Sequence, residues 1–352
     1  LDPSVPTVLL VHALTGDARA GGPGGWWGPL IGPGRPLDPT RSRLLCFNNL
    51  GSCYGSFGPS YPDWPWVPGP QPRFGLGPPE LPAAVTTWDQ ARAILRALDR
   101  LGIQRVRVAT GGSLGAMIVL ALGALAPERF EQLLPLAGSL AASPWIIGFN
   151  HVARQTILLD PDWPRGPERG LALARQLAQM TYRAEPGLTA RQGRRMRTDF
   201  PDRSTTDRPT DDGSFAGQWS SHLPYAQETY LEHQGGKLVA RFDAASYLVQ
   251  LAAMDHHDVE RAPPSPAGPD RYEVPHPWPG AGRIRSRVDA VGIDSDVLYP
   301  ARHMRALVGD RPARRYHELS SLHGHDGFLI EWPQLDAILR ASGAPFDGSS
   351  HD

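Results

Sequence analysis

The sequence predicts an α/β protein with a doubly wound, mostly parallel sheet and a helical insertion. Short apolar runs alternate with helical patterns from residue 7 to residue 136, and this alternation stops near residue 143. It resumes near residue 286 and continues towards the end of the chain. Strands and helices that alternate in this way form a parallel sheet with right-handed crossovers, and function lies at the carboxyl ends of the strands.

The first half of the predicted sheet can be followed run by run. Residues 7–12 and 43–47 are short apolar runs that end in turn residues, as buried parallel strands do. Residues 85–101 place apolar side chains at every third or fourth position, and Gly102 supplies a helix stop. A strand over residues 105–109, a helix over 114–126 and a strand over 132–136 complete this half.

The second half is separated from the first by a long helical segment. From residue 143 to about residue 285 the chain is rich in Arg and punctuated by Pro clusters. Strands over residues 288–293 and 315–319 follow, with a helix near residues 302–308 and a last helix from Phe328. We therefore expect an α/β core, residues 1–142 and 286–352, and a helical lid, residues 143–285.

Composition narrows the possible functions. The 352 residues carry a net charge of −1, which argues against a nucleic-acid binder held by a basic surface. No apolar run reaches the ~18–20 residues of a membrane helix, and no basic-then-apolar leader is present. These features favour a cytoplasmic enzyme with no membrane or nucleic-acid partner. No metal site is predicted, because no metal-ligand spacing is formed by His12, Cys46, Cys53 and the pair His256-His257.

The strongest local motif is Gly111-Gly112-Ser113-Leu114-Gly115, between a predicted strand and a predicted helix. Gly-x-Ser-x-Gly in this context is the nucleophile elbow of the α/β-hydrolase fold, and a glycine-rich phosphate turn is the alternative interpretation. The tight turn strains the serine and brings its flanks against backbone, where a Cβ would collide. Ser113 is therefore the predicted nucleophile, at a helix amino end that favours an oxyanion.

A nucleophile of this kind needs an acid and a base later in the chain, in the order Ser, Asp, His. Asp294 and Asp296 follow a predicted strand and, two residues apart on an extended chain, would point the same way. We expect Asp296 to be the catalytic acid and Asp294 to cap or brace the loop, although both could be helix caps. The loop after the last strand offers His323 and His325, and we expect His325 to be the general base.

The backbone groups that would stabilise an oxyanion are assigned by position. The first strand runs into His12-Ala13-Leu14, where this fold supplies a backbone N–H donor. We expect the N–H groups of Leu14 and Leu114 to bind the oxyanion. The other histidines, His12 among them, are expected to satisfy backbone groups or to face solvent.

Several strings together resemble the homoserine O-acetyltransferase family. They are residues 12–17 (HALTGD), 48–55 (NNLGSCYG), 58–60 (GPS), 111–115 (GGSLG) and 324–328 (GHDGF). The helical segment is similar to that family's lid at residues 154–157, 160–163, 181–183, 230–231, 234–235 and 241–247. The likeness extends from about residue 7 to residue 335. One departure is Ser56-Phe57, where the family commonly has Thr-Thr in a stretch expected to line the acceptor pocket.

The resemblance implies transfer of an acetyl group from acetyl-CoA to the side-chain hydroxyl of L-homoserine, a step towards methionine. It implies no bound cofactor, with acetyl-CoA as co-substrate, and a homodimer joined through the lids. In that family a lid Arg grips the amino-acid carboxylate and the Asp after the catalytic His holds the amino group. Those roles fall on Arg183 and Asp326, whose charges match the two ends of the substrate.

Related activities remain open at this stage. Similar transferases use serine as acceptor or succinyl-CoA as donor, and an esterase would use the same triad with water. A non-catalytic binding protein of this fold would be expected to have lost one of the triad residues. The sequence retains Ser113, Asp296 and His325.

Overall fold

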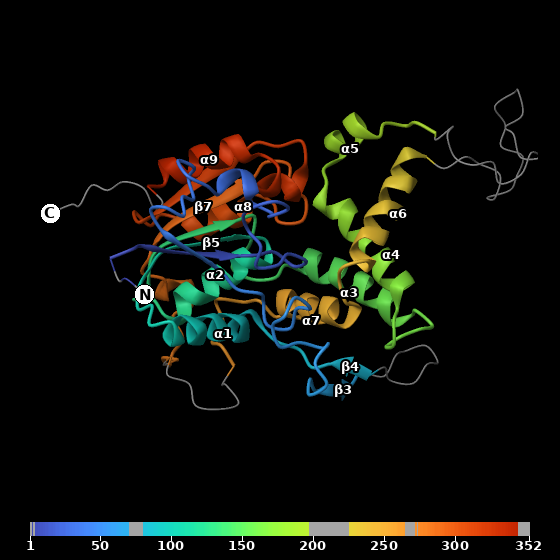
Figure 1. The fold of residues 1–352 in the computed structure, drawn as a ribbon, viewed down its shortest axis with the longest axis horizontal. Coiled ribbons are helices and arrows are strands. Elements are labelled where there is room, and N and C mark those ends of the chain that lie inside the picture. The colour runs from blue at the N-terminus through green and yellow to red at the C-terminus, as the bar shows by residue number, and fades with distance from the viewer. Residues whose placement is uncertain are drawn as a thin grey trace, which may run out of the picture.

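The protein is built on a six-stranded, fully parallel sheet (Figure 1). A computed structural model describes residues 2, 4–69, 80–196, 225–264, 272 and 274–343. In space the strands follow the order β2-β1-β5-β6-β7-β8. Their bounds are β1 Thr7–Val11, β2 Arg43–Cys46, β5 Val106–Gly112, β6 Phe130–Leu136, β7 Arg287–Ile293 and β8 Arg314–Leu319. The predicted doubly wound sheet is therefore confirmed.

Apolar side chains cover both faces of this sheet, because neighbouring residues of a strand point to opposite sides. Leu9 and Val11 of β1 belong to a core shared with α1 (Thr87–Arg100), α2 (Leu114–Leu125) and α8 (Arg302–Val308). Val8 and Leu10 belong to the core on the other face, with α9 (Trp332–Ala341) and the 3-10 turn η1 (Gly28–Leu30). Figure 1 shows α9 on one side of the sheet and α1 and α2 on the other.

Local sequence explains where the core helices begin. Thr86 caps α1 by accepting from the backbone N–H of Asp89, whose carboxylate in turn accepts from the backbone N–H of Thr86. This capping box satisfies two backbone donors at the helix start. The helix α2 is buried at every position and begins at the residue after Ser113.

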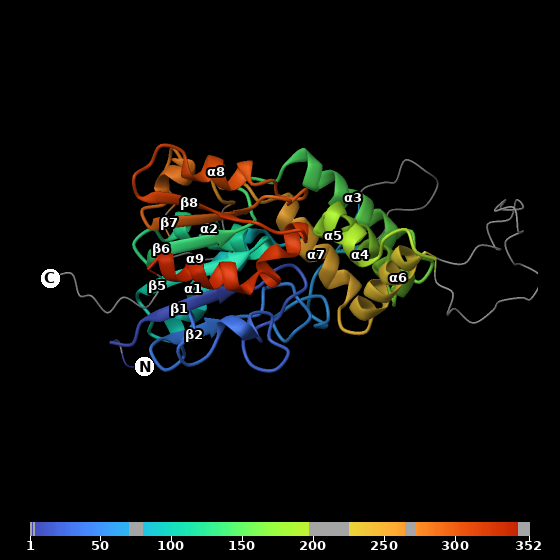
Figure 2. The same ribbon diagram turned by 90° about the horizontal axis from the view of Figure 1, so that it is seen from above.

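The described residues between β6 and β7 form five α-helices. They are α3 (Pro144–Leu158), α4 (Glu168–Tyr182), α5 (Glu185–Arg191), α6 (Ala226–Val239) and α7 (Ala244–Asp255). Both views show them as one group beside the sheet (Figures 1 and 2). Their buried side chains, such as Ile157 and Tyr247, join the core that α1 and α2 form with the sheet. A 3-10 turn, η2 (Gly280–Arg283), precedes β7.

The structure differs from the sequence prediction in several places. A short antiparallel hairpin, β3 (Trp66–Pro68) with β4 (Glu80–Pro82), was not predicted. The strand β5 continues to Gly112 instead of ending at residue 109. The segment from Phe328 is not the start of the last helix, because the 3-10 turn η3 (Gly324–Leu329) comes first and α9 begins at Trp332.

Candidate active site

Ser113 occupies the sharp turn between β5 and α2. Its backbone has a φ of 60°, a left-handed value that is unusual for a residue with a side chain. The Ser113 N–H donates to the carbonyl of Leu136 at 2.9 Å, and its carbonyl accepts from Met117 at 3.2 Å, so the turn is fixed on both sides. A strained serine held in this way lies at the amino end of a fully buried helix.

The glycines that flank Ser113 are required by the neighbouring strand β1. A Cβ at Gly111 would lie 2.3 Å from the carbonyl oxygen of Val11, and one at Gly115 would lie 2.2 Å from the same oxygen. Real Cβ atoms do not approach a backbone atom so closely. The predicted steric role of the two glycines is thus visible, and it places the end of β1 directly beside the elbow.

Asp296 and His325 form a buried pair. The Nδ1 atom of His325 lies 2.7 Å from Oδ2 of Asp296, and both side chains are almost completely buried. The other carboxylate oxygen, Oδ1, accepts from the backbone N–H groups of Leu298 and Tyr299, each at 2.8 Å. With both oxygens engaged, the carboxylate has a fixed orientation and holds the proton of His325 on Nδ1.

The surroundings of His325 set its protonation. Burial by itself lowers the pKa of His325, but the charge of Asp296, its hydrogen bond and the charge of Asp326 together raise that pKa above the usual 6.5. The rings of Tyr182, Tyr299 and Phe328 lie 5.8, 5.2 and 5.6 Å from the imidazole, centroid to centroid. The buried Nε2 atom has no hydrogen-bond partner in the described chain, so it is available to a serine hydroxyl.

The two competing candidates lie elsewhere. Asp294 is exposed, and its carboxylate accepts from the hydroxyl of Ser320 at 2.7 Å and the N–H of Ser321 at 3.0 Å. The expectation that Asp294 and Asp296 point the same way is wrong, because β7 ends at Ile293 and the chain turns there. His323 borders a small cavity together with Arg183 and Gly187, and its backbone N–H donates to the hydroxyl of Ser321.

The two proposed oxyanion donors lie on the segments that meet at the elbow. Leu114 is the first residue of α2, and Leu14 follows β1 by three residues. Both side chains are buried. Neither backbone N–H donates a hydrogen bond to another group of the chain that the structure describes. Free amides at this place are what an oxyanion would require.

Arg183 and Asp326 face each other next to His325. Nε of Arg183 lies 3.2 Å from Oδ2 of Asp326, and both side chains are mostly buried. The contact depends on Gly324, where a Cβ would lie 2.7 Å from the backbone N of Ala184. Within the described residues, Nε and Nη1 of Arg183 are buried without a hydrogen-bond acceptor.

Some neighbours of the site were not among the predicted site residues. Tyr182 and Tyr299 enclose His325 but stand on different elements, so only their positions beside Arg183 and Asp296 could have marked them. Arg241 was noted only within a lid string. Its Nη1 atom donates to the carbonyl of Thr15 at 2.7 Å and so ties the α6–α7 junction to the segment that carries Leu14.

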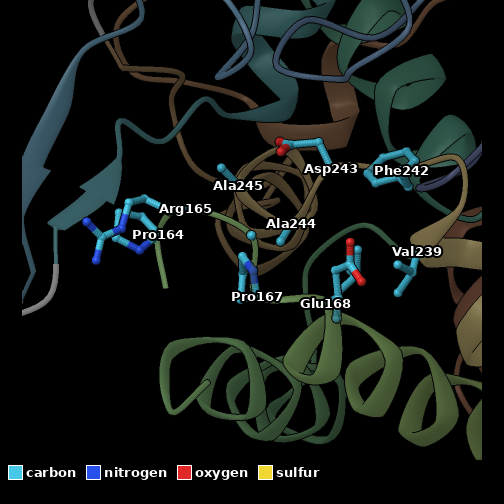
Figure 3. A pocket seen from close by; sticks show the side chains of 11 residues that line it. Pro164, Arg165, Pro167, Glu168, Val239, Phe242, Asp243, Ala244 and Ala245 are labelled. Atoms are coloured by element: carbon cyan, nitrogen blue, oxygen red, sulfur yellow. The ribbon is translucent and has the colours of Figure 1, made fainter. Parts of the chain in front are cut away.

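A cavity of about 210 Å³ lies apart from these residues (Figure 3). Arg165, in the turn before α4, and Glu168, at its start, form one wall, and Phe242 and Asp243, just before α7, form the other. None of the predicted site residues lines it. Among the described residues there is no group of three His, Cys, Asp or Glu that could hold a metal ion. No helix in the described ranges is long and apolar enough to cross a membrane.

The fold and this geometry define a class of protein. The family model for the alpha/beta hydrolase fold matches residues 6–324. Esterase E22 shares the fold, with a TM-score of 0.71 at 17% identity over 97% of this chain and 90% of that one. The structure of homoserine O-acetyltransferase from Staphylococcus aureus has a TM-score of 0.69 at 25% identity, over 97% and 86% of the two chains.

Sequence comparison narrows the class further. The homoserine O-acetyltransferase of Thermus thermophilus is 39% identical over 354 residues, which cover 95% of this chain and 80% of that protein. The homoserine O-acetyltransferase of Moorella thermoacetica is 38% identical over 355 residues, 95% and 84% of the two chains. The protein therefore belongs to the homoserine O-acetyltransferase family of α/β-hydrolase-fold enzymes.

Proposed function

We propose that the protein transfers an acetyl group from acetyl-CoA to the side-chain hydroxyl of L-homoserine, the activity in the names of its relatives. The observation that carries this acceptor is the pairing of Arg183 with Asp326 beside His325. An α-amino acid has a carboxylate and an ammonium close together, and this pair offers the complementary charge to each. Nη1 of Arg183, which is buried without a hydrogen-bond acceptor in the described chain, is suited to the carboxylate.

The first half of the reaction builds an acetyl-enzyme. Nε2 of His325 takes the proton of the Ser113 hydroxyl while Oγ attacks the thioester carbonyl of acetyl-CoA. The N–H groups of Leu14 and Leu114 stabilise the oxyanion of the tetrahedral intermediate. The carbon–sulfur bond then breaks, His325 returns the proton to the CoA thiolate, and the acetyl group remains on Ser113.

The second half transfers the acetyl group to the acceptor. Homoserine binds with its carboxylate on Arg183 and its ammonium on Asp326, which directs its hydroxyl towards the acetyl-enzyme. His325 takes the hydroxyl proton as the oxygen attacks, and it returns that proton to Ser113 when the ester bond to the enzyme breaks. Asp296 keeps the imidazole in the orientation that both halves need.

Transfer instead of hydrolysis requires that water be kept from the acetyl-enzyme. We assign this task to a lid formed by residues 143–285 over a core of residues 1–142 and 286–352. Helices α3, α4, α6 and α7 of the insertion share buried apolar side chains with the core, and Tyr182, at the end of α4, packs beside His325.

We further propose a homodimer joined through the lids. Trp145, Val152 and Leu159 are spaced by seven residues along α3 and its end, so they form one stripe, and they are 56, 49 and 65% exposed. Leu173 and Met180 repeat this spacing on α4 with 51 and 46% exposure. Exposed apolar stripes on two helices that pack on each other suit a second copy of the chain.

The cellular setting follows from the proposed reaction. Synthesis of an activated homoserine on the way to methionine belongs in the cytoplasm. The free thiols of Cys46 and Cys53 suit that reducing compartment.

The deciding experiment separates the two half-reactions. Purified protein is mixed with acetyl-CoA alone, and intact mass spectrometry should show an acetyl group on the wild type and none on Ser113→Ala. Removal of a triad residue costs about 10⁴–10⁶ in turnover, so Ser113→Ala should release almost no CoA. An acetyl adduct on Ser113→Ala would contradict the assignment of the nucleophile.

The same assay identifies the donor and the acceptor. Acetyl-CoA and succinyl-CoA are each tested against homoserine, serine and water, with release of the CoA thiol as the signal. Homoserine with acetyl-CoA should be fastest and should give parallel double-reciprocal lines. Arg183→Ala should raise the homoserine KM yet keep the burst of CoA from the first half-reaction. Turnover with water as fast as with homoserine would identify an esterase instead.

A further inference from the structure

His12 has a defined protonation state that its neighbours impose. It follows the last residue of β1, and it is completely buried. Its Nδ1 atom lies 2.8 Å from the carbonyl oxygen of Ala13, and its Nε2 atom lies 3.0 Å from the backbone N of Asn49. A backbone N–H can only donate, so Nε2 accepts and Nδ1 carries the proton that is donated to Ala13.

This state is protected against a change of pH. Burial lowers the pKa of His12 to about 4, although the Ala13 carbonyl and the charge of Asp17 act in the opposite direction. The imidazole is therefore neutral throughout the range in which His325 titrates. The side chain of Asn49 adds a second link, since its Nδ2 atom donates to the carbonyl of His12 at 3.3 Å.

The hydrogen bond from His12 acts on the peptide group that carries the Leu14 N–H. The carbonyl of Ala13 and the N–H of Leu14 belong to one planar, trans peptide, so they point in opposite directions and rotate together. The Ala13 oxygen also accepts from the N–H of Gly16 at 3.0 Å. Two donors on the oxygen fix the rotation of this peptide, and donation to a carbonyl also strengthens the N–H as a donor.

The position of this peptide gives the contact a consequence for catalysis. A Cβ at Gly115 would lie 3.1 Å from the carbonyl oxygen of His12, so the segment that begins at His12 lies against the elbow that presents Ser113. The Leu14 N–H has no hydrogen-bond acceptor in the described chain. We propose that His12 is a positioning residue for the acyl transfer: its Nδ1–H holds the Ala13–Leu14 peptide so that the Leu14 N–H faces the developing oxyanion.

This inference rests on the proposed function in requiring an acyl-enzyme on Ser113 and an oxyanion that the Leu14 N–H binds. The experiment therefore uses p-nitrophenyl acetate beside acetyl-CoA, because both form that intermediate through an oxyanion. His12→Asn keeps an N–H donor that can reach the Ala13 carbonyl, whereas His12→Leu has nearly the same shape and no donor. His257→Leu is the matched control, since His257 is also buried, has a pKa lowered to about 4 by burial, and bonds to Ser139 and Thr87.

The measured quantities are the rate of acylation at saturating ester, the KM and the affinity for a trifluoromethyl ketone, which forms a tetrahedral oxyanion on serine. His12→Leu should slow acylation about 10- to 100-fold, somewhat less than outright loss of an oxyanion donor. Its affinity for the ketone should fall in parallel while KM changes little. His12→Asn should recover most of both losses, and His257→Leu should change neither.

Each other outcome would contradict either the positioning role of His12 or the proposed function. If His12→Leu loses no more than His257→Leu, or if Asn does no better than Leu, the positioning role is wrong. If the wild type forms no acyl-enzyme from p-nitrophenyl acetate or from acetyl-CoA, the proposed function itself is wrong. Nitrogen NMR of the His12 ring in the wild type tests the proposed protonation state even when a variant does not fold. It should show the neutral Nδ1-protonated form at pH 6–8, and the Nε2-protonated form would overturn the proposal.

Discussion

Two neighbouring carboxylates decide the protonation of His325. A buried imidazole avoids charge, and here burial acts against protonation while Asp296, by charge and by hydrogen bond, and Asp326, by charge, favour it. The effect of the two carboxylates exceeds that of burial, so the pKa of His325 is raised. A general base must be neutral to accept the Ser113 proton, so this balance sets the pH at which the proposed reaction begins.

The acid limb of the pH profile should therefore lie above pH 6.5, the usual pKa of histidine. The pKa is raised in the free enzyme, so the protonated, inactive form persists to higher pH than for an isolated imidazole. We expect kcat/KM for acetyl-CoA to rise with pH through that limb. Stopped-flow release of CoA at pH 5–9 would measure it. A limb below pH 6.5 would show that Asp296 does not control this histidine.

The two aspartates should differ sharply on substitution. Asp296→Asn keeps the shape but removes the acceptor that fixes Nδ1–H, and the equivalent change in a serine triad costs about 10⁴ in turnover. Asp294→Asn disturbs only the bonds to Ser320 and Ser321 and should change turnover less than about 3-fold, as expected for an exposed residue away from the chemistry. Steady-state rates of both variants decide this. Equal losses would move the acid to Asp294.

The sequence could rank the candidate catalytic residues, but it could not show where their side chains lie. The order Ser, Asp, His and the ends of strands indicated Ser113, Asp296 and His325 as candidates. The alternation of an extended chain was misleading for Asp294, because it stops with β7 at Ile293. The bond from His12 to Ala13 had no signal, since a buried histidine that satisfies backbone groups has the same local sequence whether or not the peptide matters.

At the level of elements, the close approach of β1 to the elbow limits which residue types the turn can accommodate. β5 pairs with β1 through Val11 opposite Gly111, and with β6 through Gly112 opposite Leu136. The sequence predicted a strand ending at residue 109 because glycines are turn formers. The ladder continues because these glycines still offer backbone groups to both neighbours.

The approach of β1 makes Gly115→Ala destabilising. Its Cβ would lie 2.2 Å from the Val11 carbonyl, and neither backbone can move without disturbing the sheet, so the loss should reach about 3 kcal/mol, the upper part of the range for overpacking. Gly236→Ala is the control, because it lies in α6 and no atom of the described residues lies within 4 Å of a new Cβ. That change should stabilise by about 0.5–1 kcal/mol. Denaturant unfolding of both variants measures the difference.

The sequence did not predict the elements that are too short to show a hydrophobic pattern. The hairpin of β3 and β4 has three residues in each strand and a proline in both, too few for a period of two to be recognised. The last helix begins late because Pro333 stands in its first turn and the chain before it forms a 3-10 turn. Long apolar patterns, such as those of α1 and α2, were predicted closely.

At the scale of the whole molecule, a continuous core joins the insertion to the sheet. Ile157, Leu171 and Tyr247 from the insertion belong to the same apolar cluster as Leu9 and Leu95. Loss of packing in the insertion should therefore also destabilise the sheet and disturb the site beside Tyr182. The sequence predicts the insertion at residues 143–285, but its helices pack through contacts between distant segments that no local pattern shows.

The exposed stripes of α3 and α4 give the last prediction. Figure 2 shows α3 along the edge of the helical group, and Trp145 and Val152 on this helix are exposed. Burial of apolar area drives association, and a charge placed at the middle of such a face opposes it. Val152→Asp with Leu173→Asp should convert a dimer into a monomer of 38.3 kDa. Leu101→Asp, an exposed position at the end of α1 in the core, should leave the dimer intact.

Sedimentation equilibrium measures all three proteins. Because the stripes lie on helices that also pack towards His325 through Tyr182, the double variant should lose transferase activity in step with the fraction of monomer. A wild type that sediments as a monomer would contradict the dimer. A double variant that remains dimeric would place the interface on another face of the molecule.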